Sequence, residues 1–223
     1  MVHRRQGYRF ENDWPKEELE DDLKIIDVGI TLPVDMEIKA DQVVLNLESA
    51  KEHFVKARKI SVMNCSCRTK RRNCDAPLNT CIDINEIAER NIANGTSREI
   101  NLAEALQILD MSHRAGLVHM AYVRKDIPPK LGDINSICSC CSCCCDVLSA
   151  VLRFGLAPHL LKSYSTSVTD ESKCIDCGVC ADRCQFGAKE MVEGSLKFKP
   201  ELCFGCGLCV STCPTNAISL MPK

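Results

Sequence analysis

The stretches CIDCGVCADRC, at residues 174–184, and CFGCGLCVSTCP, at residues 203–214, decide how the C-terminal part of this chain folds. Each stretch carries four cysteines in the spacing C-x2-C-x2-C-x3-C. A thiolate at every third residue turns a short loop so that three sulfurs reach three irons of one cubane, while the fourth sulfur points away from it. The tandem repeat therefore predicts two [4Fe–4S] clusters that exchange their fourth ligands.

This exchange assigns each of the eight cysteines to a cluster. Zinc ribbons, the main alternative, use two C-x2-C pairs separated by a longer loop, which differs from three evenly spaced cysteines followed by a fourth. The spacing thus favours iron–sulfur clusters over a zinc ribbon or a disulfide scaffold. We expect one cluster to be bound by Cys174, Cys177, Cys180 and Cys213, and the other by Cys203, Cys206, Cys209 and Cys184.

Ten further cysteines precede these runs, within CSCRTKRRNCDAPLNTC at 65–81 and CSCCSCCC at 138–145. Adjacent cysteines direct their side chains differently, which a hydrophobic core does not need, and disulfides between immediate neighbours are strained. Metal ligation is the remaining interpretation. The expected ligands are Cys65, Cys67, Cys74, Cys81, Cys138, Cys140, Cys141, Cys143, Cys144 and Cys145.

The spacing of these ten cysteines does not show which of them share a centre. We favour two further [4Fe–4S] clusters with two spare thiols, which gives four clusters in all. One cluster accompanied by zinc or free thiols is an alternative, and a larger, non-cubane iron–sulfur centre is another.

Composition and charge restrict the class of protein. The chain has 223 residues, a net charge of −2 and 18 cysteines. A near-neutral balance gives no reason to expect a nucleic-acid partner. We see no secretory signal and no apolar stretch long enough to span a membrane. So many thiols in a reducing compartment favour metal ligation over disulfides, and we expect a cytoplasmic protein of an anaerobic or micro-aerobic host.

The pattern along the chain predicts an α+β protein: a cysteine-rich domain of helical or mixed structure, followed by a ferredoxin-like, pseudo-twofold dicluster domain. We expect an N-terminal arm at 1–48, the cysteine-rich domain at 49–165 and the dicluster domain at 166–223. Predicted strands are 23–32, 43–47, 60–63 and 117–123. Predicted helices are 50–59, 83–93 capped by Asp83, 102–115 capped by Asn101, and 147–154 capped by Asp146.

The C-terminal region resembles bacterial dicluster ferredoxins, and every ligand position matches. Residues from about 50 to 223 also resemble a family of multi-cluster, ferredoxin-like iron–sulfur proteins of anaerobes. The matching features are Cys65-Ser66-Cys67-Arg68, Cys74, Cys81, Gly116-Leu117-Val118-His119, the run Ile137 through Cys144, and the terminal dicluster module. This family consists mostly of electron carriers, so the resemblance implies redox protein partners.

Gln185 stands where the family pattern has proline after the fourth cysteine of a run. Proline has no N–H, so glutamine restores a donor near a cluster sulfur. Because hydrogen bonds to sulfur favour the reduced cluster, we expect the cluster that contains Cys184 to be the easier of the two to reduce.

His113 and His119 lie near the end of the predicted helix 102–115. We expect both to have a structural role and not to bind metal.

The pattern favours a ferredoxin-like electron carrier, or an electron-relay subunit of a larger oxidoreductase complex or homo-oligomer, over an enzyme in its own right. One alternative is an iron–sulfur enzyme subunit whose N-terminal cluster has an open iron site. A less favoured one is a redox-sensing or metal-sensing regulator. We find no residues in a catalytic arrangement.

Overall fold

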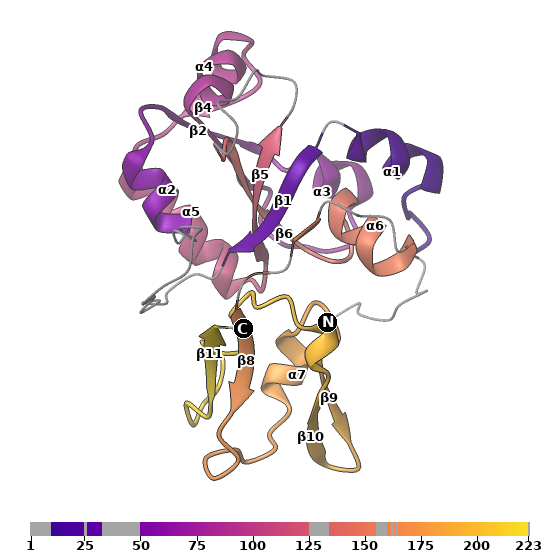
Figure 1. Cartoon of the computed structure of the whole chain (residues 1–223). Coiled ribbons are helices and arrows are strands. Elements are labelled where there is room, and N and C mark those ends of the chain that lie inside the picture. The colour runs from indigo at the N-terminus through magenta and orange to yellow at the C-terminus, as the bar shows by residue number, and fades with distance from the viewer. Residues whose placement is uncertain are drawn as a thin grey trace.

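The computed structural model describes residues 10–24, 26–32, 50–124, 134–154, 160–161, 163 and 165–222. Helices and strands are mixed along the chain, which confirms the predicted α+β class. Two parts are visible in Figure 1: a larger part built around one sheet, and a C-terminal module, defined here as residues 165–222.

The larger part is organised by a seven-stranded sheet in the order β4-β2-β3-β6-β5-β1-β7. Its neighbouring strands are antiparallel, except that β1 and β7 run parallel. Cys81 of β3 lies directly opposite Cys138 of β6, which brings together two cysteines 57 positions apart in sequence. The strands are β1 (Ile26–Leu32), β2 (Ile60–Asn64), β3 (Asn79–Ile84), β4 (Arg98–Glu99), β5 (Val118–Arg124), β6 (Ser136–Cys140) and β7 (Leu160–Leu161).

Helices lie on both sides of this sheet (Figure 1). Helices α2 and α5 pack against each other on one side, and α1 packs on α6 on the other side, next to α3. The helices are α1 (Lys16–Leu23), α2 (Ala50–Lys56), α3 (Ser66–Arg71), α4 (Asn85–Ala93), α5 (Leu102–Arg114) and α6 (Asp146–Phe154).

The two faces of the sheet differ in chemistry because successive side chains of a strand point to opposite faces. Ile82 of β3 and Ile137 of β6 join the apolar core beneath α2 and α5. Their neighbours Cys81 and Cys138 line a cavity on the opposite face. One face therefore supplies a conventional hydrophobic core, and the other presents cysteines.

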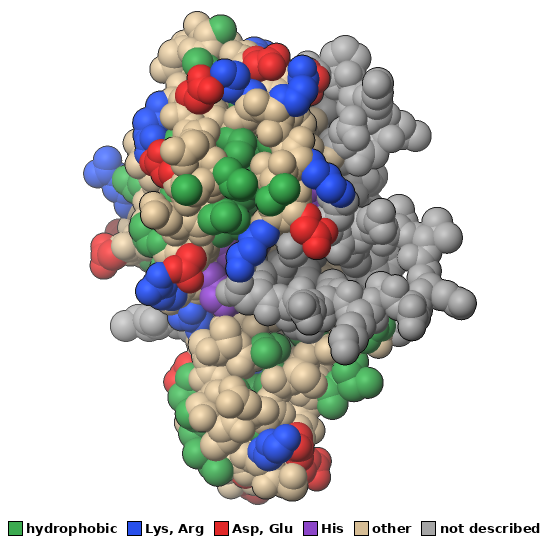
Figure 2. Space-filling view, turned by 90° about the vertical axis from the view of Figure 1, so that its left-hand side faces the viewer, with side chains coloured by type: hydrophobic (Ala, Val, Ile, Leu, Met, Phe, Trp, Pro, Cys, Tyr) green, Lys and Arg blue, Asp and Glu red, His purple; other side chains and the backbone are tan. Residues whose placement is uncertain are grey.

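The outer side of α2 and α5 carries basic and acidic side chains interspersed around a small hydrophobic patch (Figure 2). No single sign of charge dominates this face, in keeping with the near-neutral composition. No helix among the described residues is both long and apolar enough to cross a membrane.

The C-terminal module consists of two similar halves with little regular structure. Two antiparallel pairs, β8 with β11 and β9 with β10, frame it. Glu193 and Gly194 form the turn between β9 and β10, and both have positive φ, at 50° and 80°. The elements are β8 (Ser165–Thr169), α7 (Val179–Arg183), β9 (Lys189–Val192), β10 (Ser195–Phe198), a 3-10 turn (Pro200–Leu202) and β11 (Ile218–Pro222).

Most predicted elements of the larger part are present. The Asn101 cap is confirmed, because its side chain accepts a hydrogen bond from the Glu104 amide at the start of α5. The Asp83 cap is wrong: Asp83 lies within β3, Ile84 is the N-cap residue of α4, and the Asp83 carboxylate accepts hydrogen bonds from Ser136 Oγ at 2.6 Å and Asn91 Nδ2 at 2.8 Å. Helix α1 was not predicted from the sequence. The predicted strand 43–47 lies outside the described residues.

Leu109 on α5 is fully buried in the apolar core, whereas Leu102 on the same helix is 37 % exposed. Because a leucine-to-alanine change in a core removes buried surface and leaves a cavity, Leu109→Ala is expected to destabilise the fold by about 2–5 kcal/mol. Leu102→Ala is the matched control and should change stability by less than about 1 kcal/mol. Anaerobic thermal unfolding checks both; equal shifts would contradict the placement of this core.

Candidate metal centres

The C-terminal module contains two cavities, and each is lined by four cysteines from both runs. Apolar side chains, including Phe186 and Leu208, surround the cavity next to the larger part. The cysteines of that cavity are Cys184, Cys203, Cys206 and Cys209. The cysteines of the outer cavity are Cys174, Cys177, Cys180 and Cys213. These are the two groups that the sequence spacing assigned to two clusters, including the exchanged fourth members.

The sulfurs within each of these groups are spread around their cavity. Among the described residues, the hydrogen bonds of these eight cysteines go to other partners, such as Ser167 Oγ for Cys209 and the Ala217 amide for Cys213. No three of the eight sulfurs, all of which belong to described residues, lie within 4.8 Å of one another. In a cubane each thiolate binds a different iron, so this less compact grouping of the sulfurs fits a [4Fe–4S] cluster.

The cysteine run at 138–145 serves two different places. Cys138 and Cys140 are two residues apart on β6 and therefore point to the same face of the sheet. The chain then turns tightly, and the Cys145 amide donates to the Cys141 carbonyl at 3.1 Å. This turn separates the sulfurs of Cys141, Cys143 and Cys144 from those of Cys138, Cys140 and Cys145.

The first of these places, which we call the four-thiol site, consists of Cys74, Cys141, Cys143 and Cys144. Their sulfurs all lie within 4.8 Å of one another. Cys74 Sγ is 3.8 Å from Cys141 Sγ and 3.8 Å from Cys144 Sγ, and Cys143 Sγ is 3.8 Å from Cys144 Sγ. All eighteen cysteines of the chain are free thiols, so these contacts are not disulfides.

The second place, which we call the six-thiol cavity, encloses about 410 Å³. The two cavities of the C-terminal module measure about 20 and about 10 Å³. Interactions between neighbouring thiols run through the six in the order Cys138, Cys81, Cys65, Cys67, Cys145 and Cys140. Trp14, Glu18, Asp22, Tyr122 and Asp146 also line the cavity. The structure thus divides the ten N-terminal cysteines into four and six.

Arg68 connects the two places. Its amide donates to Cys65 Sγ at 3.4 Å, and its guanidinium lies 3.6 Å from Cys141 Sγ. Burial lowers the pKa of Arg68, but the thiolates of Cys141 and Cys65 outweigh burial and raise that pKa above its ordinary value. Interactions with Cys67 and Cys81 lower the pKa of Cys65 to about 3. The thiolate is the form of cysteine that binds metal. The buried positive charge of Arg68 stabilises thiolates, so it supports metal binding at both the six-thiol cavity and the four-thiol site.

Burial shifts the pKa of two groups that line the six-thiol cavity. Burial raises the pKa of Asp146, and burial together with the charge of Cys140 raises the pKa of Tyr122 well above its usual range. The Tyr122 hydroxyl lies 3.8 Å from Cys140 Sγ. A neutral phenol can donate a hydrogen bond to a thiolate without adding negative charge.

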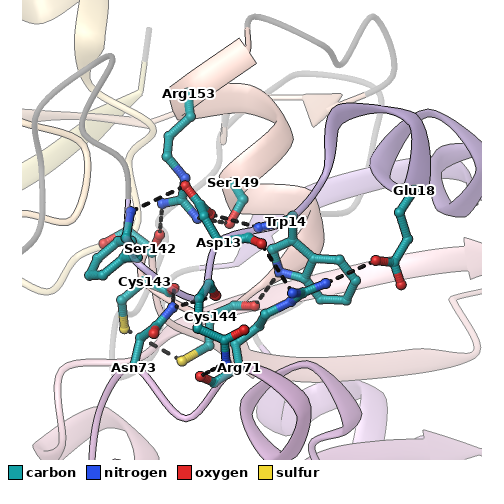
Figure 3. A network of polar contacts seen from close by, with 12 residues as sticks. Asp13, Trp14, Glu18, Arg71, Asn73, Ser142, Cys143, Cys144, Ser149 and Arg153 are labelled. Atoms are coloured by element: carbon teal, nitrogen blue, oxygen red, sulfur yellow. Dashed lines mark hydrogen bonds and ion pairs between the residues drawn. The ribbon is translucent and has the colours of Figure 1, made fainter.

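Three successive carbonyls of the cysteine turn are each fixed by a side chain from a different segment (Figure 3). Arg153 donates to the Ser142 carbonyl at 2.6 Å, Asn73 to the Cys143 carbonyl at 2.9 Å, and Trp14 Nε1 to the Cys144 carbonyl at 2.8 Å. Arg153 also forms an ion pair with Asp13 at 2.8 Å, with both side chains 3 % exposed. These hydrogen bonds therefore fix the course of the turn.

The sequence analysis gave Trp14 no role. The contact that defines it joins positions 130 residues apart, and no local pattern shows such a contact. Arg71 lies over the Trp14 ring at 3.9 Å and is 8 % exposed, while Arg68 is 1 % exposed. These two arginines of the basic stretch at 68–72 thus point inward, although a run of charges more often marks a solvated surface.

Gln185 joins the C-terminal module to the cysteine turn. Its side-chain oxygen accepts hydrogen bonds from the Ser142 amide at 3.1 Å and the Ser142 hydroxyl at 2.6 Å, and its nitrogen donates to the Gly116 carbonyl at 2.8 Å. Among the described residues, the backbone N–H of Gln185 makes no hydrogen bond to a sulfur. The proline-to-glutamine departure therefore has a docking role, and the difference in potential stays a prediction.

The histidine pair lies at the same junction. His113 Nε2 is 2.6 Å from Ser211 Oγ of the module, and His119 Nδ1 is 3.0 Å from Ser139 Oγ. The two rings stack with their centroids 5.9 Å apart. Neither histidine is part of the four-thiol site or lines the six-thiol cavity, and the structural role of both stays a prediction.

Comparison with known proteins agrees with the geometry of the module. Residues 167–220 match a family model described as a 4Fe-4S dicluster domain. No match was found among curated proteins. The matched segment contains all eight cysteines of the two runs. The match and the cysteine-rich sites support an iron–sulfur protein that transfers electrons and therefore has redox partners.

Arg68 and Arg72 offer a test of the buried cation. Removing one member of a buried charged network leaves its partners without compensation, so Arg68→Met is expected to destabilise the protein by about 3–5 kcal/mol. Arg72 is exposed, so Arg72→Met should change stability by no more than about 0.5 kcal/mol. Anaerobic thermal unfolding measures both variants. A tolerated Arg68→Met would show that this guanidinium does not compensate the thiolates.

Proposed function

We propose that this protein is a one-electron carrier, or the relay subunit of a larger redox complex, in which two clusters of the C-terminal module connect to a third iron–sulfur centre in the six-thiol cavity. In this proposal Cys184, Cys203, Cys206 and Cys209 bind the cluster nearer the larger part. Cys174, Cys177, Cys180 and Cys213 bind the outer cluster.

The observation that carries the proposal is one continuous buried cluster of residues. It contains Cys184 and Cys203 from the module and Cys140 and Cys145 from the six-thiol cavity. Met120, Val147 and Leu148 pack among them. Electron transfer between metal centres requires that they lie close together in a rigid, water-poor setting, and this arrangement supplies one.

The six-thiol cavity supports a centre with more ligands than a single cubane needs. A [4Fe–4S] cluster takes four cysteine ligands, whereas six thiols surround this cavity. The division into four and six favours one iron–sulfur centre of six thiols over two further cubanes. The six-thiol centre remains our proposal.

Reductive titration of the anaerobic protein tests the relay. We expect paramagnetic signals from the two ferredoxin clusters. We also expect a third signal, from the six-thiol centre, that shows magnetic coupling to the ferredoxin clusters. Cys65→Ala should remove the third signal and leave the first two. The control is Cys174→Ala, which should remove the signal of the outer ferredoxin cluster and leave the third signal. Iron and sulfide contents that do not exceed those of two cubanes would contradict the relay.

The exchange of fourth ligands has its own test. Cys213 belongs by sequence to the second run but lines the outer cavity with Cys174, Cys177 and Cys180. Cys213→Ser should therefore alter the spectrum and potential of the same cluster as Cys177→Ser. Cys184→Ser should instead alter the cluster that responds to Cys206→Ser. The opposite pairing, in which each run binds its own cluster, would overturn the assignment.

A second candidate function rests on the polar groups of the six-thiol cavity. Glu18, Asp22 and Lys70 line it together with the cysteines, and they offer groups that a substrate could contact. A centre there with an open iron site would make the protein an enzyme subunit. Adding carbon monoxide or cyanide to the reduced protein tests this candidate: a shift confined to the third signal supports it, and unchanged spectra exclude it.

A further inference from the structure

We infer that the four-thiol site binds a single zinc ion, which is structural and separate from every iron–sulfur centre of the chain. The inference depends on the positions of Cys74, Cys141, Cys143 and Cys144. It would stand even if the relay proposed above were wrong, because none of these four residues lines the six-thiol cavity or the ferredoxin cavities.

The separation of the sulfurs decides how many metal ions fit among them. Zinc binds thiolates at about 2.3 Å in a tetrahedron, and the edge of such a tetrahedron is about 3.8 Å. Three of the sulfur pairs are 3.8 Å apart, and all four sulfurs lie within 4.8 Å of one another. These separations match the ligands of one ion.

The same separations exclude a cubane. The thiolates of a cubane bind four different irons, which are themselves separated, so the sulfurs stand farther apart than the ligands of one ion. The ferredoxin cysteines illustrate the difference: among the described residues they do not form a group as compact as the four-thiol site. The chain therefore contains one compact group of four cysteines, the four-thiol site, and two less compact groups of four in the C-terminal module.

Zinc and a single iron both accept four thiolates in a tetrahedron. An iron would be a further redox centre, and hydrogen bonds to its sulfurs would set its potential. Among the described residues one N–H donor reaches these sulfurs, the guanidinium of Arg68 at Cys141. Three of the four cysteines are buried, and four protein ligands leave no open position. A closed site with four thiolates is typical of structural zinc.

The position of the site indicates what the ion would stabilise. Cys74 lies on the segment between α3 and β3, and the other three ligands form the turn between β6 and α6. The ion would join these segments beside Ser142, which holds Gln185 of the C-terminal module. Because zinc bound by four thiolates contributes directly to folding free energy, it would fix the junction across which the module docks.

X-ray absorption at the zinc edge of the intact, anaerobically prepared protein tests the inference without any mutation. We expect about one zinc per chain with four sulfur neighbours at about 2.3 Å. Absence of zinc from protein grown with both metals would overturn the inference. So would iron spectra that show a single tetrahedral iron, or a cubane, bound by these four cysteines.

Paired variants locate the ion. Cys143→Ala should lose at least nine tenths of the zinc, whereas Cys138→Ala, a change in the six-thiol cavity on the same run, should retain it. The paramagnetic signals of the two ferredoxin clusters report whether each variant is folded. Zinc that is lost from Cys138→Ala and retained by Cys143→Ala would place it in the cavity and contradict the inference. If Cys143→Ala does not fold, the absorption spectrum of the unchanged protein decides.

Discussion

The tight turn between β6 and α6 determines how this molecule distributes its sulfur. On β6 the alternation of side chains sends Cys138 and Cys140 to the same face of the sheet. The turn then directs Cys141, Cys143 and Cys144 to the four-thiol site. Cys145, at the end of the turn, lines the six-thiol cavity again. Neighbouring cysteines can therefore serve separate metal centres, which explains why so many of them stand side by side. The other structural features of the site keep this turn in place.

Those features are hydrogen bonds and one positive charge supplied by four side chains. The carbonyls of the turn are fixed by Arg153, Asn73 and Trp14, and Arg68 places a positive charge between the two groups of thiols. A buried thiolate without such compensation is costly, and so is a buried arginine without an anion. The two therefore support each other. Gln185 then connects the turn to the C-terminal module, so the positions of these cysteines and the docking of the module depend on one loop.

The sequence allowed the C-terminal module to be predicted because its ligands are local: a regular spacing within eleven residues defines each loop. It also predicted the helix that begins after Asn101, whose cap is local too. The division of the ten N-terminal cysteines was not predictable, since it depends on the pairing of β3 with β6, which places Cys81 opposite Cys138. The roles of Trp14 and Arg68 depend on contacts 130 and 73 residues apart. The Asp83 cap failed because tertiary partners, Ser136 among them, bind its carboxylate instead.

The central claim is that the ten N-terminal cysteines form two distinct metal centres, one that binds iron and one that binds zinc. Anomalous X-ray scattering from crystals of the anaerobic protein, measured at the iron and the zinc edges, tests it most directly. The account predicts iron at both ferredoxin cavities and within the ring of Cys65, Cys67, Cys81, Cys138, Cys140 and Cys145. It predicts zinc, without iron, between Cys74 and the turn at 141–144. Iron at both N-terminal positions, or one centre bridging all ten cysteines, would contradict it.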